Sequence, residues 1–191
     1  MNCEQAEAMV KKALSKKRFT PTVNVRDAAV AMARQYGADE QKAALAALLH
    51  DAAKELPKEE LLQILRENAI IAGDAENSPP PVWHGVAASI LAQTRWGVED
   101  KEVLDAIRYH TTGRPGMTKL DKIIFLSDMI SAERSYPEVE ELRRLARQDL
   151  DTAVTVALRY NVEWMEACGK TIDPLSRQAL DDLEKRARPA E

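Results

Sequence analysis

An adjacent histidine and aspartate interrupt an otherwise apolar, helix-forming run of this sequence. Residues 45–53 consist of alanine and leucine apart from His50 and Asp51. Alanine and leucine favour helix, and a helix that is apolar on all sides is typical of the buried centre of an all-α protein. An imidazole and a carboxylate are costly to bury there unless a partner satisfies them. A metal cation would do so, because both groups are metal ligands.

Three further side chains extend this pattern. The chain contains three histidines, and the other two, His84 and His110, lie on segments that we expect to be helical. Asp128 lies in residues 122–130, which are again mostly apolar. Each has a simpler explanation when taken alone, since buried histidines and acids are usually satisfied by hydrogen bonds. Together they predict a metal site made of His50, Asp51, His84, His110 and Asp128.

Composition narrows the class of protein. A chain of 191 residues suits one domain with a core of its own. Its net charge is −4, whereas nucleic-acid-binding proteins are usually basic, so the charge argues against nucleic-acid binding. No apolar run approaches the roughly 20 residues of a membrane span, and the N-terminus lacks the apolar core of a signal peptide. Cys3 and Cys168 are too few for a disulfide framework. We therefore expect a cytoplasmic protein that binds neither nucleic acid nor membrane.

The rest of the sequence predicts helices and no strands, because no segment alternates apolar and polar residues as a strand does. Asn2 is a suitable cap for the first helix and Thr20 for the second, with Pro21 at its first position. Thr118 with Asp121 resembles a capping box for the helix that contains Asp128. Besides the helix that contains Asp128, the expected helices span residues 2–15, 21–36, 39–54, 58–68, 83–96, 99–111, 138–168 and 174–188. Residues 72–81 are expected to form a loop.

Two of the candidate ligands have informative surroundings. His84 is expected in the first turn of its helix, where the helix dipole keeps an imidazole neutral. His110 is followed by a sharp turn containing Gly113 and Arg114, with Arg108 just before it. Guanidinium groups and the backbone amides of such a turn suit phosphate, although the segment could simply connect two helices. Lys54 could likewise be an ordinary lysine at a helix C-terminus.

The order of these residues resembles that of the HD-domain metallophosphohydrolases. The resemblance is more specific in residues 47–54 (Ala-Leu-Leu-His-Asp-Ala-Ala-Lys), in Trp83-His84-Gly85, in residues 105–117 (Asp-Ala-Ile-Arg-Tyr-His-Thr-Thr-Gly-Arg-Pro-Gly-Met) and in Ser127-Asp128. These stretches are similar to those of the YqeK family, which are bacterial symmetrical diadenosine tetraphosphate hydrolases.

The resemblance implies a fold and an activity. The fold would be an all-α HD-domain helical bundle, with residues 1–191 as a single HD domain. Its metal-site core would span about residues 18–135, and C-terminal helices in residues 138–188 would pack on this core. The activity would be the symmetrical cleavage of diadenosine tetraphosphate, a dinucleoside polyphosphate, into two ADP. Two divalent or trivalent metal ions, usually iron in this family, would be required, and a homodimer is possible.

The resemblance also implies a role for each site residue. Asp51 would bridge the two metals, with His50 and Asp128 on one of them and His84 and His110 on the other. Two cations can lower the pKa of a bridging water and neutralise the charge that builds on phosphate. The predicted catalytic residues are Asp51, Lys54 and Arg114. The predicted substrate-binding residues are Lys54, Arg108, Thr111, Gly113, Arg114 and Arg134.

This chain departs from the family pattern at two places. Pro21 stands where the family has a histidine that serves the same metal as His50 and Asp128. Ser131-Ala132 stands where the family often has Glu-Pro. Two alternatives to the proposed activity therefore stay open. One is an HD-domain phosphatase that acts on another nucleotide. The other is a nucleotide-binding protein whose catalysis is reduced or lost.

Overall fold

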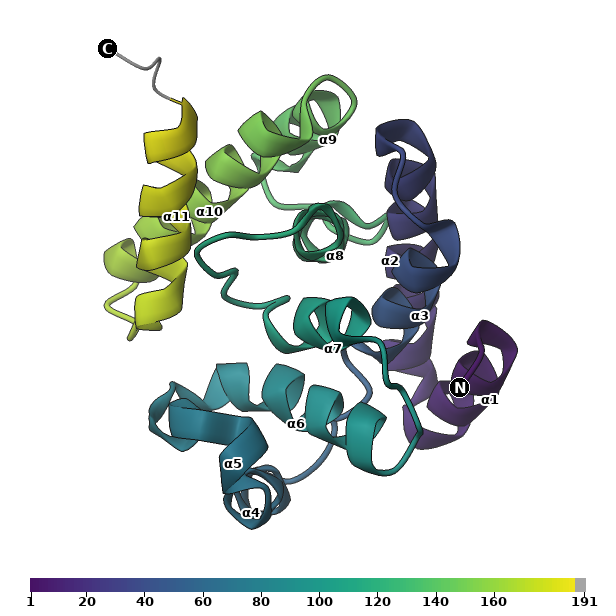
Figure 1. The fold of residues 1–191 in the computed structure, drawn as a ribbon. Coiled ribbons are helices and arrows are strands. Elements are labelled where there is room, and N and C mark those ends of the chain that lie inside the picture. Colours follow the sequence, from purple (N-terminus) through teal and green to yellow (C-terminus); the bar gives the residue numbers. More distant parts are fainter. Residues whose placement is uncertain (188–191) are drawn as a thin grey trace.

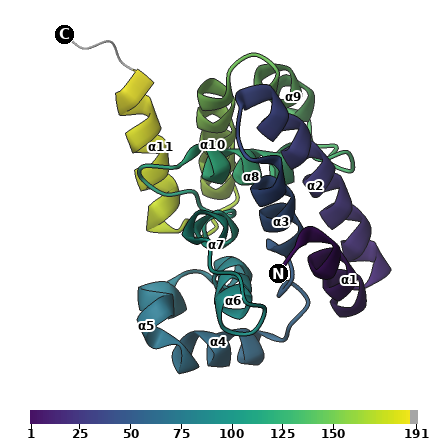
Figure 2. The ribbon, with the colours of Figure 1, turned by 45° about the vertical axis from the view of Figure 1, so that its right-hand side comes forward.

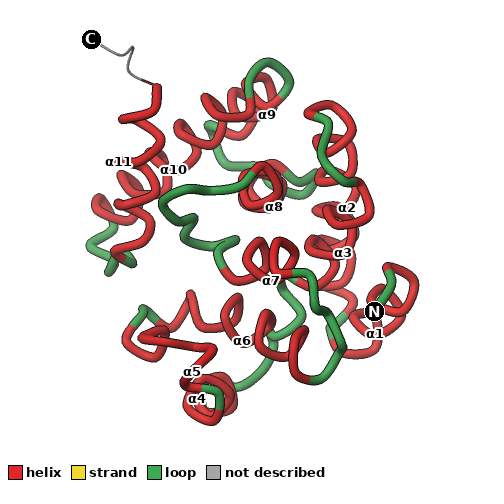
Figure 3. The backbone as a smooth tube through the Cα atoms, viewed as in Figure 1, coloured by secondary structure: helices red, strands yellow, loops and turns green. Residues whose placement is uncertain are grey.

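The computed structural model describes residues 1–187, and within this range every regular element is helical (Figures 1 and 3). An all-α fold is therefore confirmed. The elements are α1 (Cys3–Ala13), α2 (Lys16–Tyr36), α3 (Glu40–Leu49), α4 (Lys58–Glu67), α5 (Ala69–Ala72), the 3-10 helix η1 (Gly73–Asn77), α6 (Pro80–Thr94), α7 (Lys101–Arg108), α8 (Lys119–Ile130), α9 (Val139–Ala146), α10 (Leu150–Ala167) and α11 (Pro174–Ala187).

Local sequence signals set several helix starts. Asn2 forms a capping box with Gln5 at α1, as expected for an asparagine at this position. Thr118 and Asp121 form the predicted capping box at α8. Asp149 caps α10 by accepting a hydrogen bond from the backbone amide of Thr152, and it divides the long helix predicted for residues 138–168 into α9 and α10. Such side-chain acceptors satisfy amide groups that have no partner within the helix.

The prediction that α2 begins at Pro21 is wrong. The helix begins at Lys16, and Pro21 lies inside it. Proline cannot donate a hydrogen bond to the carbonyl four residues earlier, here that of Lys17. The helix tolerates this loss because Pro21 lies little more than a turn from its start, after helix-favouring lysine and arginine residues. Ser15 marks the start instead, and its amide and hydroxyl groups both donate to the carboxylate of Glu55.

Residues 72–81 are not the expected loop. The segment contains the end of α5, the whole of η1 and the first residues of α6. Pro80 suits the first turn of α6 because no amide hydrogen is needed there. At the other end of the chain, α11 is described to Ala187, so Arg188, the last residue of the predicted helix, lies outside the described residues.

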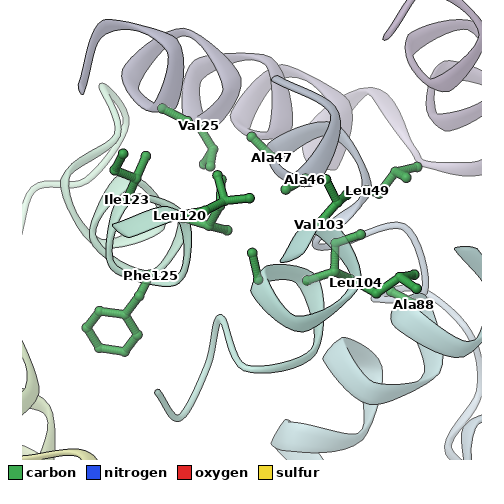
Figure 4. Close-up of a cluster of buried hydrophobic side chains, with 14 of the residues drawn as sticks. Val25, Ala46, Ala47, Leu49, Ala88, Val103, Leu104, Leu120, Ile123 and Phe125 are labelled. Carbon is green, nitrogen blue, oxygen red and sulfur yellow. The ribbon is translucent and has the colours of Figure 1, made fainter. Parts of the chain in front are cut away.

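Helix α3 lies at the centre of the arrangement and contacts α1, α2, α6, α7 and α8. Figure 4 shows buried side chains of four helices gathered there, with Leu120 of α8 lying among Val25 of α2, Ala47 of α3 and Val103 of α7. The alanines of α3 allow several helices to approach it closely. Figure 2 shows α11 at one edge of the molecule beside α10, which also contacts α8 and α9. Among the described helices, none is both long and apolar enough to cross a membrane.

A glycine fixes the turn between α7 and α8. Gly113 has a φ of +67°, and a Cβ atom there would lie 3.1 Å from Cβ of Ala179 and 3.3 Å from Sδ of Met117. Gly169 has a similar φ of +62° but nothing within 4 Å of its would-be Cβ.

We expect Gly113→Ala to lower the free energy of unfolding by about 2–4 kcal/mol, because backbone strain and overpacking add. Gly169→Ala is the matched control and should lose only the strain, about 1–2 kcal/mol. Chemical denaturation of both variants measures the difference. Equal losses would show that the turn does not pack against α11 as described.

Candidate metal centre

His50 and Asp51 lie where α3 ends. The helix stops at Leu49, and both residues belong to the turn that follows, so the prediction that α3 continues to Lys54 is wrong. The His50 ring is 1% exposed, and its Nδ1 lies 2.6 Å from the carbonyl oxygen of Ala47. An Nδ1–H that donates to this carbonyl leaves Nε2 as the free nitrogen, which is the usual arrangement of a metal-binding histidine.

His110 uses the same arrangement at the end of α7. The helix ends at Arg108, so His110 also lies in a turn rather than on the predicted helix. Its Nδ1 lies 2.8 Å from the carbonyl oxygen of Ile107. Gly85 of α6 allows the close approach, because a Cβ atom there would lie 3.0 Å from Cε1 of His110 and 3.2 Å from the carbonyl oxygen of Arg108. His84 is the residue before this glycine, beyond the first turn of α6 in which it was predicted.

The carboxylate of Asp51 lies among all three imidazoles. Its Oδ1 is 3.0 Å from Nε2 of His84 and 3.7 Å from Nε2 of His110, whereas its Oδ2 is 3.8 Å from Nε2 of His50. The two nitrogens Nε2 of His84 and His110 are 3.1 Å apart. His50, Asp51 and His110 each offer a ligand atom, and these atoms lie within 4.8 Å of one another.

Asp128 lies near this cluster on α8. Its Oδ1 is 4.0 Å from Nε2 of His50 and accepts a hydrogen bond from the guanidinium group of Arg134. The structure thus brings the five residues predicted as ligands together: His50, Asp51, His84, His110 and Asp128. Whether each of them binds metal stays a prediction.

The protonation states in the cluster suit a bound cation. Burial lowers the pKa of His50, and it lowers the pKa of His84 to about 4, so both imidazoles are neutral near pH 7. Burial alone would raise the pKa of Asp51, but the neighbouring histidines and Lys54 hold it well below its usual value. Oδ1 of Asp51 is buried, and although Nε2 of His84 lies 3.0 Å away, the two groups are not aligned as a hydrogen bond. A cation would satisfy this oxygen, and neutral imidazoles with ionised carboxylates are the ligand forms that it needs.

Two predicted phosphate-binding residues contact the cluster directly. Nζ of Lys54 lies 3.0 Å from Nε2 of His84 and 3.5 Å from Oδ1 of Asp51, so Lys54 is more than a helix-end lysine. Arg134 is paired with Asp128 and also donates to its backbone carbonyl.

Thr111 follows His110, and its hydroxyl oxygen is buried without a hydrogen-bond partner.

The other predicted phosphate-binding residues contact protein groups instead. Arg114 is paired with Asp121 at 2.8 Å and with Asp105 at 3.2 Å, and its guanidinium group lies 5.0 Å from the centre of the Tyr109 ring. Arg108 donates hydrogen bonds to the carbonyl oxygens at the end of α5. Both arginines thus stabilise the surroundings of His110, and phosphate binding by them stays a prediction.

Sequence reasoning missed the partners of Arg114. Asp121 was recognised only as a capping-box residue, yet it is 2% exposed and binds Arg114 as well as the backbone amide of Thr118. No sequence pattern links Asp105 on α7 with Asp121 on α8, because the pairing depends on how these helices pack. The capping-box position of Asp121 was the one signal that the sequence offered.

Pro21 lies on the part of α2 that approaches the end of α8. One turn later, Nδ2 of Asn24 donates a hydrogen bond of 2.9 Å to Oε2 of Glu133. Glu133 immediately precedes Arg134, the partner of Asp128. The helix that carries Pro21 therefore contacts the loop that holds one of the candidate ligands in place.

Comparisons with known proteins agree with this geometry. Residues 18–133 match the family model described as "HD domain". The chain is 40% identical to the "Bis(5'-nucleosyl)-tetraphosphatase, symmetrical" of Bacillus subtilis over 91% of this chain and 93% of that protein. It is 37% identical to the protein of the same name from Halalkalibacterium halodurans, over 91% of this chain and 92% of that one.

A solved structure is similar over almost its whole length. A "predicted HD superfamily hydrolase involved in NAD metabolism" from Clostridium acetobutylicum matches with a TM-score of 0.91 and 34% identity, covering 96% of this chain and 97% of that one. The chain belongs to the HD domain family and, within it, to the family of the symmetrical bis(5'-nucleosyl)-tetraphosphatases.

We expect Asp51→Ala to remove most of the metal that copurifies with the protein, because Asp51 faces all three imidazoles. His110→Ala should lose less, since it removes one ligand from one side of the cluster. Elemental analysis of freshly purified protein measures both, and circular dichroism should show that helix content is retained. Asp181→Ala, at an exposed position of α11, is the matched control. Wild-type metal content in Asp51→Ala would rule out the assigned site.

Proposed function

We propose that this protein hydrolyses diadenosine tetraphosphate symmetrically, releasing two ADP, and that the cluster around Asp51 is its active site. The observation that carries the proposal is a buried carboxylate whose two oxygens face different imidazoles, in a chain of this family. The class of substrate follows from the relatives, which are named symmetrical bis(5'-nucleosyl)-tetraphosphatases.

The cluster is suited to two metal ions. His50 and Asp128 lie on the Oδ2 side of Asp51, and His84 and His110 lie on its Oδ1 side. We propose that His50, Asp51 and Asp128 would hold one ion, that Asp51, His84 and His110 would hold the other, and that the ions would be iron, since iron accepts mixed imidazole and carboxylate ligands. Bound there, the metals would supply an activated water and neutralise the developing charge on phosphate.

The protein's own cations would orient the polyphosphate. Lys54 lies beside Asp51 and Arg134 lies beside Asp128, so positive charge is present on two sides of the carboxylates. These groups attract the substrate and hold its phosphate oxygens in position for attack. Arg114, Arg108 and the turn containing Thr111 and Gly113 complete the proposed phosphate site. Symmetric cleavage would require these groups to hold the two central phosphates, so that the attack falls at the middle of the chain of four.

The domain organisation, cellular location and partners of the enzyme can be proposed as well. We propose that residues 1–191 form one HD domain that acts in the cytoplasm on small nucleotides and does not bind nucleic acid. Its acidic net charge of −4 supports the last point, because duplex binding is driven by basic surfaces.

Product analysis tests the proposed reaction. Metal-loaded protein incubated with diadenosine tetraphosphate should yield ADP as its only nucleotide product, as separated by ion-exchange chromatography. Protein with Asp51→Ala, purified in the same way, controls for contaminating hydrolases and should yield none. ATP together with AMP would contradict symmetric cleavage. Tight substrate binding without turnover would favour a nucleotide-binding protein, and faster turnover of another nucleotide would favour the phosphatase alternative.

A second prediction concerns Pro21, the residue at which this chain departs from the family pattern. We expect Pro21→His to raise the metal content per chain and to increase turnover at limiting metal, because the variant restores an imidazole on the side of His50 and Asp128. It should cost little stability, since it also restores an amide hydrogen inside α2. Thr20→His adds the same side chain at a neighbouring exposed position and should change neither quantity. If Pro21→His binds no more metal than Thr20→His, Pro21 does not stand at a ligand position.

A further inference from the structure

A cavity borders the segments that carry two of the candidate metal ligands, His84 and His110. It measures about 380 Å³ and lies between η1, the first half of α6, the end of α7 and the start of α11. Val82 and Val86, which line it, share one face of α6, and His84 lies on a different face of the same helix. Tyr109 and Thr112 lie close to His110 in the sequence. In Figure 1 these elements meet where the lower end of α11 faces the left-hand end of α6.

One wall of this cavity contains a buried acid with an unsatisfied oxygen. Asp173 is 4% exposed, and its Oδ1 accepts a hydrogen bond of 2.9 Å from the backbone amide of Leu175 at the start of α11. Its Oδ2 is buried and has no hydrogen-bond partner. A buried acceptor without a partner is costly, so a donor from a ligand would be stabilising there. The χ2 angle of aspartate varies over a broad range. A small rotation of the Asp173 carboxylate can therefore bring Oδ2 toward such a donor while Oδ1 still accepts the hydrogen bond from the amide of Leu175.

The remaining walls suit a flat aromatic ring. Val82, Val86 and Leu175 provide apolar surface, and Tyr109 provides an aromatic ring. The volume falls within the usual range for small-molecule sites, roughly 300–1,000 Å³. Arg108 adds a positive charge at the wall, held by the carbonyl oxygens of Ile71 and Ala72. The lining also includes the polar residues Asp74, Asn77, Ser78 and Thr112, and Asp173 differs from them in being buried with an unsatisfied carboxylate oxygen.

We propose that this cavity binds a purine base of the substrate and that Asp173 selects bases with an exocyclic amine. The amine donates a hydrogen bond to Oδ2 of Asp173, the base lies between the apolar walls, and Arg108 at the wall faces the phosphates. The identity of the base as adenine rests on the proposed function. A hollow beside α4 is a poorer candidate because three glutamates, Glu59, Glu60 and Glu67, line it and none of its lining residues has a buried polar atom without a hydrogen-bond partner.

Nucleoside binding tests this proposal separately from hydrolysis, because nucleosides have no phosphate to cleave. The probes are adenosine and purine riboside, which differ only in the exocyclic amine, titrated by calorimetry into metal-loaded protein. The wild-type protein should bind adenosine more tightly by roughly 10- to 100-fold, the value of a hydrogen bond to a charged group. Asp173→Asn should lose this preference. The side-chain oxygen of the asparagine can still cap α11, and its NH2 group then replaces Oδ2, so two hydrogen-bond donors face each other.

Two further variants separate recognition from structure. Asp149→Asn makes the same change at the cap of α10, away from the cavity, and should keep the wild-type preference. Ala75→Phe fills the cavity from η1 and should weaken binding of both nucleosides. An unchanged preference in Asp173→Asn, wild-type binding in a folded Ala75→Phe, or equal binding of both nucleosides by the wild-type protein would overturn the proposal. A clear adenosine preference in a protein that fails to cleave diadenosine tetraphosphate would instead refute the proposed function and leave the amine-selective site in place.

Discussion

The structure is organised around the burial of one carboxylate. Asp51 lies in the interior, where an isolated charge would be strongly unfavourable, and the protein offsets this cost by surrounding it with three imidazoles and Lys54. These groups come from the ends of α3 and α7, from α6 and from the turn that contains Asp51 itself. The helices must therefore converge on one point. The alanines of α3 and the absence of a side chain at Gly85 make that convergence possible.

The same local arrangement positions two of the imidazoles. His50 and His110 each follow the end of a helix, and each places Nδ1 within hydrogen-bond distance of the carbonyl oxygen three residues earlier. That carbonyl has no partner further along the helix, so the histidine satisfies it while its own Nε2 faces Asp51. The ends of α3 and α7 thus serve both the fold and the site. The Arg114 pairs with Asp105 and Asp121 then fix the turn that follows His110.

The sequence allowed the all-α fold and the convergence of the candidate ligands to be predicted, because His50, Asp51 and Asp128 interrupt apolar helical segments. It could not show that α3 ends before His50, since alanine and leucine on both sides favour helix equally. Pro21 was misread as a helix start because a proline near an N-terminus fits either position. The partners of Arg114 and the unsatisfied oxygen of Asp173 depend on contacts between helices distant in sequence, which no local pattern records.

The central claim is that the cluster around Asp51 binds metal, and anomalous X-ray diffraction tests it most directly. Crystals of protein purified with iron should be measured on both sides of the iron absorption edge. The account predicts an anomalous peak bonded to Asp51 and His110, with Nζ of Lys54 moved away from its position beside His84. Crystals of iron-containing protein with no peak at Asp51, and with Lys54 still in contact with His84, would contradict it.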